Sequence, residues 1–195
     1  MNSVYLKEDS YDDIDMLDEY NREYLEKYPD FEPFVTRDNY SEVLKNNELL
    51  KKGIGNDGIK EVFYWAIENN KIIGHASVRL NPEDNPSVLK YSGHIMYGVV
   101  PSKRNLGYGS IICHLLIKEM DKLGYTDIIV TCSDDNLSSI RVIEKNFGKL
   151  IETVEPDNYY VSSKTRRYKI NVKESLNSYN KKYENSDEKN IKIMI

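Results

Sequence analysis

The sequence has few of the residues that build disulfide-linked or metal-binding proteins. Its 195 residues include only two cysteines and three histidines. Cys113 and Cys132 lack the CxxC spacing of a redox or zinc motif, and too few histidines are near them to complete a zinc site. We therefore expect two reduced thiols, no bound metal and a cytoplasmic location.

Long hydrophobic runs and an excess of positive charge are also absent. No segment approaches the roughly 20 consecutive apolar residues that span a bilayer. Residues 1–13 are acidic and polar, so we expect no secretory signal. The formal net charge is −5, whereas general nucleic-acid binding needs a basic surface. We expect no membrane and no nucleic acid as partners, although a local basic patch is compatible with this charge.

What is present is typical of a globular domain. Hydrophobic residues make up 39% of the chain and charged residues 30%, and the length suits one core. We expect a single domain over residues 1–172 and a polar tail over 173–195. Residues 173–190 are mostly Asn, Lys, Ser, Glu and Asp, which predicts solvated chain. The apolar end, 191–195, is expected to be disordered, with a strand added to a neighbour as the alternative.

Hydrophobic periodicity and turn residues predict two N-terminal helices followed by a mixture of strands and helices. Apolar residues at helical spacing indicate the helices, and short aromatic or β-branched runs indicate the strands. Asn69-Asn70 predicts a tight turn between the first two strands, and the stretch with Pro82 and Pro86 predicts a loop. The expected helices cover 11–28, 40–52, 111–123 and 136–146, and the expected strands cover 62–68, 71–80, 94–100, 128–132, 150–154 and 166–172.

The loop between the strand that ends at Val100 and the next helix carries the most chemical information. The first N–H groups of a helix have no internal partner, and the helix dipole adds positive charge there. Gly107 and Gly109 let a ligand approach the backbone closely, and Lys103 and Arg104 supply full charges. These features together predict a phosphate or pyrophosphate site.

The same loop resembles the hallmark of the GNAT superfamily of acyl-coenzyme A N-acyltransferases: Gln or Arg, two variable residues, Gly, one more residue, then Gly or Ala. Arg104, Gly107 and Gly109 match it, and the likeness extends over about 64–172. The stretches GHIMYGVVPSKRNLGYG and TCSDDNLSSIRVIEKNFG are similar to a bacterial acetyltransferase branch. The resemblance implies an α+β fold, with helices flanking a mixed, mostly antiparallel sheet that contains one splayed parallel strand pair. It also implies acetyl-CoA as co-substrate, and homodimers are frequent in the family.

The resemblance also implies where the cofactor lies. Family members bind the pyrophosphate on the loop amides and pair the preceding strand with pantetheine, so the thioester would lie between strands 94–100 and 128–132. Asn136 and Ser139 match a further cofactor-contacting pair. Asn136 is also suited to be a helix N-cap, and its amide can do both. The implied contacts are Val99, Val100, Lys103, Arg104, Asn105, Leu106, Gly107, Tyr108, Gly109, Ser110, Asn136 and Ser139.

The catalytic acid and base are not given by the resemblance. Many relatives place a proton-donating tyrosine seven residues after the Asn, where this chain has Ile143. The attacking amine must also lose a proton. His94 and Tyr97, on opposite faces of the strand before the loop, are the catalytic candidates, although a histidine at a strand start is more often structural. Asp134 and Glu61 are further candidates for the base.

Three other features have simpler explanations. Cys132 would permit transfer through an acetyl-cysteine, but no base or orienting partner is evident, and most relatives transfer directly in a ternary complex. Residues 53–58 satisfy GxGxxG, yet a polar helix precedes them instead of a strand, so we expect a loop. An acidic run would attract a cationic amine or form a solvated helix face; it contains Asp12, Asp13, Asp15, Asp18 and Glu19.

The sequence thus predicts an N-acetyltransferase that moves an acetyl group from acetyl-CoA to a primary amine of a small molecule or peptide. One alternative is a non-catalytic acyl-CoA-binding sensor or scaffold, which Ile143 supports. A second is another phosphate-ligand domain whose likeness to the family is accidental.

Overall fold

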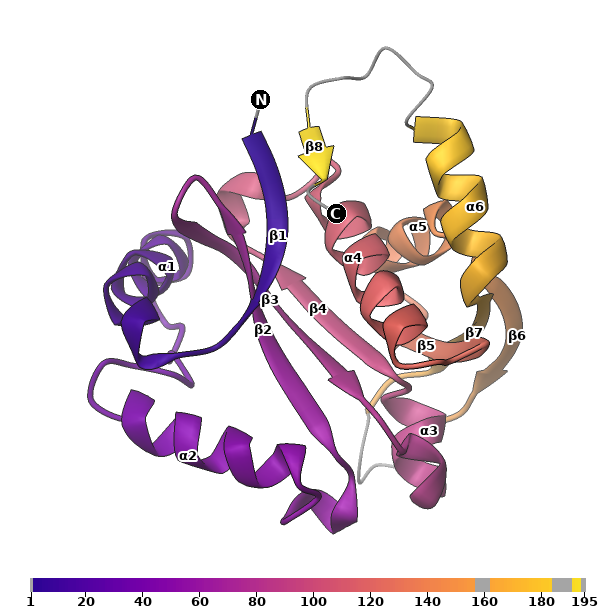
Figure 1. Cartoon of the computed structure of the whole chain (residues 1–195), viewed down its shortest axis with the longest axis horizontal. Helices are drawn as coiled ribbons and strands as arrows, with labels where there is room; N and C mark the ends of the chain where they lie inside the picture. The colour runs from indigo at the N-terminus through magenta and orange to yellow at the C-terminus, as the bar shows by residue number, and fades with distance from the viewer. Residues whose placement is uncertain (1, 157–161, 184–190, 194–195) are drawn as a thin grey trace.

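The computed structural model describes residues 2–156, 162–183 and 191–193, and two β-sheets form its centre (Figure 1). The larger sheet has the strand order β4-β3-β2-β1-β8 and the smaller one β5-β7-β6. Paired strands are antiparallel except β8, which runs parallel to β1. The strands are β1 (Asn2–Glu8), β2 (Glu61–Glu68), β3 (Lys71–Arg79), β4 (Ile95–Val99), β5 (Asp127–Ser133), β6 (Lys149–Val154), β7 (Thr165–Asn171) and β8 (Ile191–Ile193).

Helices cover both faces of the larger sheet. Helices α1 and α2 lie on one face and α4 crosses the other, with α5 and α6 beyond it (Figure 1). This arrangement confirms the expected α+β architecture with a mostly antiparallel sheet. The helices are α1 (Ile14–Lys27), α2 (Tyr40–Lys51), α3 (Pro86–Tyr91), α4 (Tyr108–Lys122), α5 (Leu137–Lys145) and α6 (Val172–Tyr183).

Helix α4 forms the centre of the core. Ile112, Leu116 and Ile117 are completely buried, because the helix lies between the sheet on one side and α5 and α6 on the other. Burying an aliphatic side chain of this size contributes about 1.5–3 kcal/mol. The apolar face predicted for residues 111–123 is therefore confirmed, and burial extends beyond that face.

The β2–β3 hairpin is also confirmed. Asn69 and Asn70 both have positive φ, 52° and 58°, the backbone of a two-residue turn that matches strand twist. The hairpin brings His75 opposite Trp65 on one side and opposite Gly98 of β4 on the other. This register positions the site described below.

Four segments differ from the sequence predictions. Residues 2–8 form β1, and 86–91 form α3 within the expected loop. The expected solvated tail is wrong over residues 173–183, which belong to α6 (Val172–Tyr183); the buried Val172, Ser175 and Tyr179 of this helix recur at helical spacing and face the core. Expected disorder is likewise wrong for Ile191–Ile193, which pair with β1. The intervening stretch 184–190 lies outside the described residues.

Strands β4 and β5 belong to different sheets and meet near their beginnings. The N–H of His94, just before β4, donates to the Ile129 oxygen of β5 at 2.8 Å. Farther along both strands, Met96 and Tyr97 face Thr131 and Cys132 across a cavity of about 280 Å³. The contacts advance in the same direction along the two strands, so they form the expected splayed parallel pair.

Candidate active site

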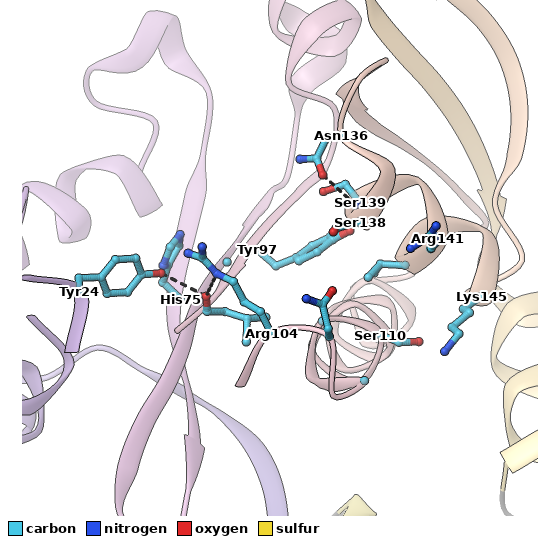
Figure 2. A pocket seen from close by; sticks show the side chains of 16 residues that line it. Tyr24, His75, Tyr97, Arg104, Ser110, Asn136, Ser138, Ser139, Arg141 and Lys145 are labelled. Carbon is cyan, nitrogen blue, oxygen red and sulfur yellow. Dashed lines mark hydrogen bonds between the residues drawn. The ribbon is translucent and has the colours of Figure 1, made fainter. Parts of the chain in front are cut away.

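A cavity of about 730 Å³ extends from β4 along the following loop to the start of α4 and to α5 (Figure 2). Nine residues expected at the site line it: Tyr97, Val99, Arg104, Asn105, Gly107, Gly109, Ser110, Asn136 and Ser139. Seven others that line it were not expected: Tyr24, His75, Gly98, Ser138, Arg141, Val142 and Lys145. We call this space the β4–α5 cavity.

The loop before α4 presents backbone to the β4–α5 cavity. Asn105 and Gly107 have positive φ, 61° and 92°, and Gly107 is the N-cap of α4. A Cβ at Gly107 would meet no other atom within 4 Å, so the backbone there is open to a ligand. Gly109 has a second role, because a Cβ there would lie 3.1 Å from Val142 of α5. The open helix start is suited to hold an anion.

Cationic side chains flank this cavity on two sides. Arg104 extends from the loop, whereas Arg141 and Lys145 extend from α5 on the opposite side (Figure 2). The Arg104 Nε donates to the Val99 oxygen at 3.0 Å, and its Nη1 donates to the Tyr28 hydroxyl at 2.7 Å. An acidic protein thus carries a local basic patch around one cavity, which suits a ligand with several phosphates.

Two polar residues at the ends of helices complete the wall. The Asn136 Oδ1 accepts from the Ser139 N–H at 3.0 Å, so Asn136 is the N-cap of α5 (Figure 2). The capping bond uses the amide oxygen and leaves the NH₂ as a donor. The Ser110 hydroxyl accepts from Asn146 Nδ2 at 3.2 Å, which joins α4 to the end of α5.

Four residues expected to contact the cofactor do not line the cavity. Val100 is buried, and Leu106 is exposed to solvent outside the cavity. The Lys103 Nζ lies 2.8 Å from Glu68 Oε2, and the Tyr108 hydroxyl donates to the same carboxylate at 2.9 Å. Because Glu68 is buried, its charge needs these partners. The Lys103 charge therefore compensates Glu68 and does not face the β4–α5 cavity.

His94 has a structural position. Its Nδ1 accepts from the Ile129 N–H at 3.0 Å, so the proton of the neutral ring is on Nε2, which lies 2.8 Å from Glu83 Oε1. Burial lowers the pKa of His94 although Glu83 acts in the opposite direction. The residue is 2% exposed and lines none of the cavities described, and its hydrogen bonds fasten the start of β4 to β5.

Tyr97 lines both the β4–α5 cavity and the smaller cavity between β4 and β5. Burial raises the pKa of its hydroxyl well above the ordinary value, so it stays protonated at neutral pH. Ile143, at the position of the usual tyrosine, is completely buried in the core.

Burial also raises the pKa of Cys132 to about 11, so that side chain is a thiol and a poor nucleophile at neutral pH.

Neither carboxylate suggested by the sequence, Glu61 or Asp134, lines any of the cavities described. Glu61 Oε1 accepts from the Ser77 hydroxyl at 2.6 Å and lies 3.1 Å from Arg79.

Among the described residues, no three or more His, Cys, Asp or Glu side chains are grouped to hold a metal ion. Within the same residues, no helix is long and apolar enough to cross a membrane.

A second cavity, of about 410 Å³, lies between α1, α2 and the larger sheet. We call it the α1–α2 cavity. Its walls are mainly aromatic and aliphatic, and they include Tyr20, Val43, Trp65 and Met96. His75 lines both this cavity and the β4–α5 cavity, so it lies between the two spaces.

His75 is held in place by α1 and β4. Its Nδ1 lies 2.7 Å from the Tyr20 hydroxyl. On the other side the ring covers Gly98, where a Cβ would lie 2.3 Å from His75 Cε1 and 2.5 Å from Nε2. Burial, with a contribution from the Arg104 charge, lowers the pKa of His75, so the ring is neutral at pH 7. Nothing in the sequence marked this histidine, because it lies inside a strand with no motif around it.

Cross-strand pairing places His75 and Tyr97 on opposite faces of the sheet. His75 pairs with Gly98, and Tyr97 pairs with Ala76, so alternation sends their side chains to different sides. His75 faces α1, and Tyr97 faces the α4 and α5 side (Figure 2). A reacting group at the edge of β4 would thus have one of these side chains on each side.

Comparison with known proteins agrees with this geometry. The model of the acetyltransferase (GNAT) family matches residues 14–148. None of the curated proteins matches the chain. A Salmonella typhimurium acetyltransferase that modifies the N-terminal serine of ribosomal protein L7/L12 has a similar fold, with a TM-score of 0.62 and 16% identity over 87% of this chain and 95% of that one.

Two further solved structures share the fold. The aminoglycoside acetyltransferase AAC(6')-Ib, in complex with coenzyme A, has a TM-score of 0.62 and 19% identity over 90% of this chain and 98% of its own. A spermidine N-acetyltransferase chimera from Vibrio cholerae and hSSAT has a TM-score of 0.59 and 13% identity over 90% and 99%. The family match covers more than half of the chain, and the loop, helix start and splayed strands lie within it. The chain therefore belongs to the acetyltransferase (GNAT) family.

Proposed function

We propose that this acetyltransferase transfers an acetyl group from acetyl-CoA, bound in the β4–α5 cavity, to a primary amine that enters through the α1–α2 cavity. The observation that carries the proposal is that His75 lines both cavities. Two separate spaces on either side of one side chain would allow both substrates to bind together, which supports direct transfer in a ternary complex. The protonated thiol of Cys132 argues against an acetyl-cysteine intermediate.

The cofactor-binding assignment rests on backbone and charge. The open amides around Gly107 would hold the pyrophosphate, and Arg141 and Lys145 would bind further phosphate oxygens. The Asn136 NH₂, free of the capping bond, would donate to the pantetheine arm. Val99 lines the cavity beside it. Lys103 is removed from this set because its charge is paired with Glu68.

His75 is the proposed general base. Acetyl-CoA supplies a thioester carbonyl carbon that a free amine nitrogen attacks, and that nitrogen becomes acidic as its bond to carbon forms. A neutral His75 with its hydrogen on Nδ1, directed to the Tyr20 oxygen, leaves Nε2 free to take the released proton. Tyr97, on the opposite face, would donate a hydrogen bond to the departing thiolate, which takes a proton from solvent while His75 returns one to solvent.

A coupled assay tests this function: thiol release from acetyl-CoA, followed with a chromogenic disulfide across a panel of primary amines. We expect amine-dependent release, and His75→Gln should lower kcat about 100-fold or more, within the range for a lost general base. His94→Gln is the matched control; it should leave kcat within a few-fold of wild type if the protein folds. Release that no amine accelerates would favour the non-catalytic sensor, and a larger loss in His94→Gln would reverse the assignment of the base.

The state of the cysteines supports a cellular setting for this function. Cys113 and Cys132 are both free thiols among the described residues. Free thiols suit a reducing compartment, which supports a cytoplasmic enzyme.

A further inference from the structure

The α1–α2 cavity has walls that suit an apolar ligand. Phe31, Val35, Val43 and Phe63 are among the apolar side chains that line it. Asp9 is the only side chain among its described lining residues that carries a full charge at neutral pH. A volume of about 410 Å³ falls within the range for small-molecule sites. The cavity therefore has room for one ring system, but too few charged side chains to pair with a ligand that carries several charges.

Most acidic groups near this cavity already have partners. Asp9 Oδ2 accepts from Asn47 Nδ2 at 2.5 Å, so the single carboxylate of the wall has a hydrogen-bond donor. The acidic run on α1 points elsewhere, since Asp15 and Asp18 pair with Arg37. Two more of its members are paired, Asp13 with Lys7 and Glu19 with Lys71. A polycation in the cavity would lose water without finding matching anions.

An exposed aromatic side chain marks the entrance. Phe34, between α1 and α2, lines the α1–α2 cavity, yet its side chain is 91% exposed. Its backbone is held in place, because the Phe34 oxygen accepts from Asn39 Nδ2 at 3.1 Å. A large aromatic ring held at the mouth of an apolar cavity is suited to close over an apolar ligand.

We propose that the acceptor is a small primary amine that carries one large uncharged apolar group, of the size of an arylalkylamine. The apolar group occupies the α1–α2 cavity, and the amine reaches His75 at the junction with the thioester. This inference rests on the proposed function and narrows it. It separates this chain from the relatives named for polyamine and aminoglycoside substrates.

Wild-type kcat/KM across a matched panel decides the inference. 2-Phenylethylamine should exceed ethylamine by about ten-fold or more, because each buried CH₂ equivalent adds roughly four-fold. It should also exceed spermidine, kanamycin and the peptide Phe-Gly-Gly. If a polycation or the peptide is the best substrate, the acceptor is not a small apolar amine, but the proposed function still holds. Thiol release that is independent of every amine would contradict both the acceptor class and the proposed function.

A variant pair locates the binding group. Val43→Asp places a charge on the wall of the α1–α2 cavity, and it should lower kcat/KM for 2-phenylethylamine at least ten-fold while acetyl-CoA affinity stays unchanged. Leu49→Asp is the matched control, since Leu49 is on the same helix but exposed and outside the cavity. Unchanged affinity for acetyl-CoA shows that each variant is folded. Equal effects of the two variants on kcat/KM would overturn the placement of the acceptor.

Discussion

Replacing Gly98 with alanine should act almost entirely through His75. The new Cβ would lie 2.3 Å from His75 Cε1, whereas ordinary van der Waals contacts are 3.4–4 Å. The ring must therefore retreat by about 1 Å, and its other side is held by Tyr20 at 2.7 Å. Losing that hydrogen bond costs about 1 kcal/mol, and overpacking adds about 1–3 kcal/mol. We expect Gly98→Ala to lower the free energy of unfolding by about 2–4 kcal/mol.

A double-mutant cycle tests this reasoning by urea denaturation. In a His75→Ala background the clash is gone, so Gly98→Ala should cost less than about 1 kcal/mol there. The expected coupling between the two positions is thus about 2 kcal/mol. The same cost of Gly98→Ala in both backgrounds would refute the argument, since some other neighbour would then oppose the Cβ. Loss of kcat in Gly98→Ala should accompany the displaced ring.

Two further predictions concern the proposed phosphate site and the core. Arg141→Glu should weaken acetyl-CoA binding about ten-fold or more, as measured by calorimetric titration. Lys122→Glu, the same charge change at the far end of α4, should have little effect on this affinity. Equal losses of affinity in the two variants would indicate an effect of net charge instead of a local contact. Burial lowers the pKa of His114 to about 3, and its ring stacks on Tyr179 at 3.8 Å. The unfolded chain, with a histidine pKa near 6.5, binds more protons than the folded chain between pH 6.5 and 3, so the free energy of unfolding should fall over that window, by about 2–3 kcal/mol at pH 4.5. His114→Phe should remove this part of the pH dependence, as measured by urea denaturation at several pH values. The same dependence of the free energy of unfolding on pH in the variant would contradict this prediction.

Much of the wall of the β4–α5 cavity could be predicted, because its signals are local. A strand, a loop with two glycines and an arginine, and an amphipathic helix adjoin one another in the sequence, and the helix start is fixed by backbone geometry alone. Lys103 was expected at this cavity and does not line it, for a non-local reason: its partner, the buried Glu68, ends the distant strand β2. Sequence proximity to the loop gave no information about that ion pair.

The proposed acceptor cavity and the proposed base depend on tertiary structure. His75 is one histidine inside a predicted strand, and only the pairing of β3 with β4 places it over Gly98 between two cavities. Helix α6 was missed because its polar composition outweighed three buried positions, Val172, Ser175 and Tyr179. Their spacing of three and four residues is a helical signal that could have identified it.

A crystal structure with a bisubstrate analogue, in which coenzyme A is joined through an acetyl bridge to 2-phenylethylamine, would locate both substrates at once. We expect the pyrophosphate at the Gly107 amides, the phenyl ring in the α1–α2 cavity, and the amide nitrogen about 3 Å from His75 Nε2. The sulfur should lie on the Tyr97 side of β4. An amide nitrogen remote from His75, with the phenyl ring outside the α1–α2 cavity, would exclude both His75 as the base and this cavity as the acceptor site.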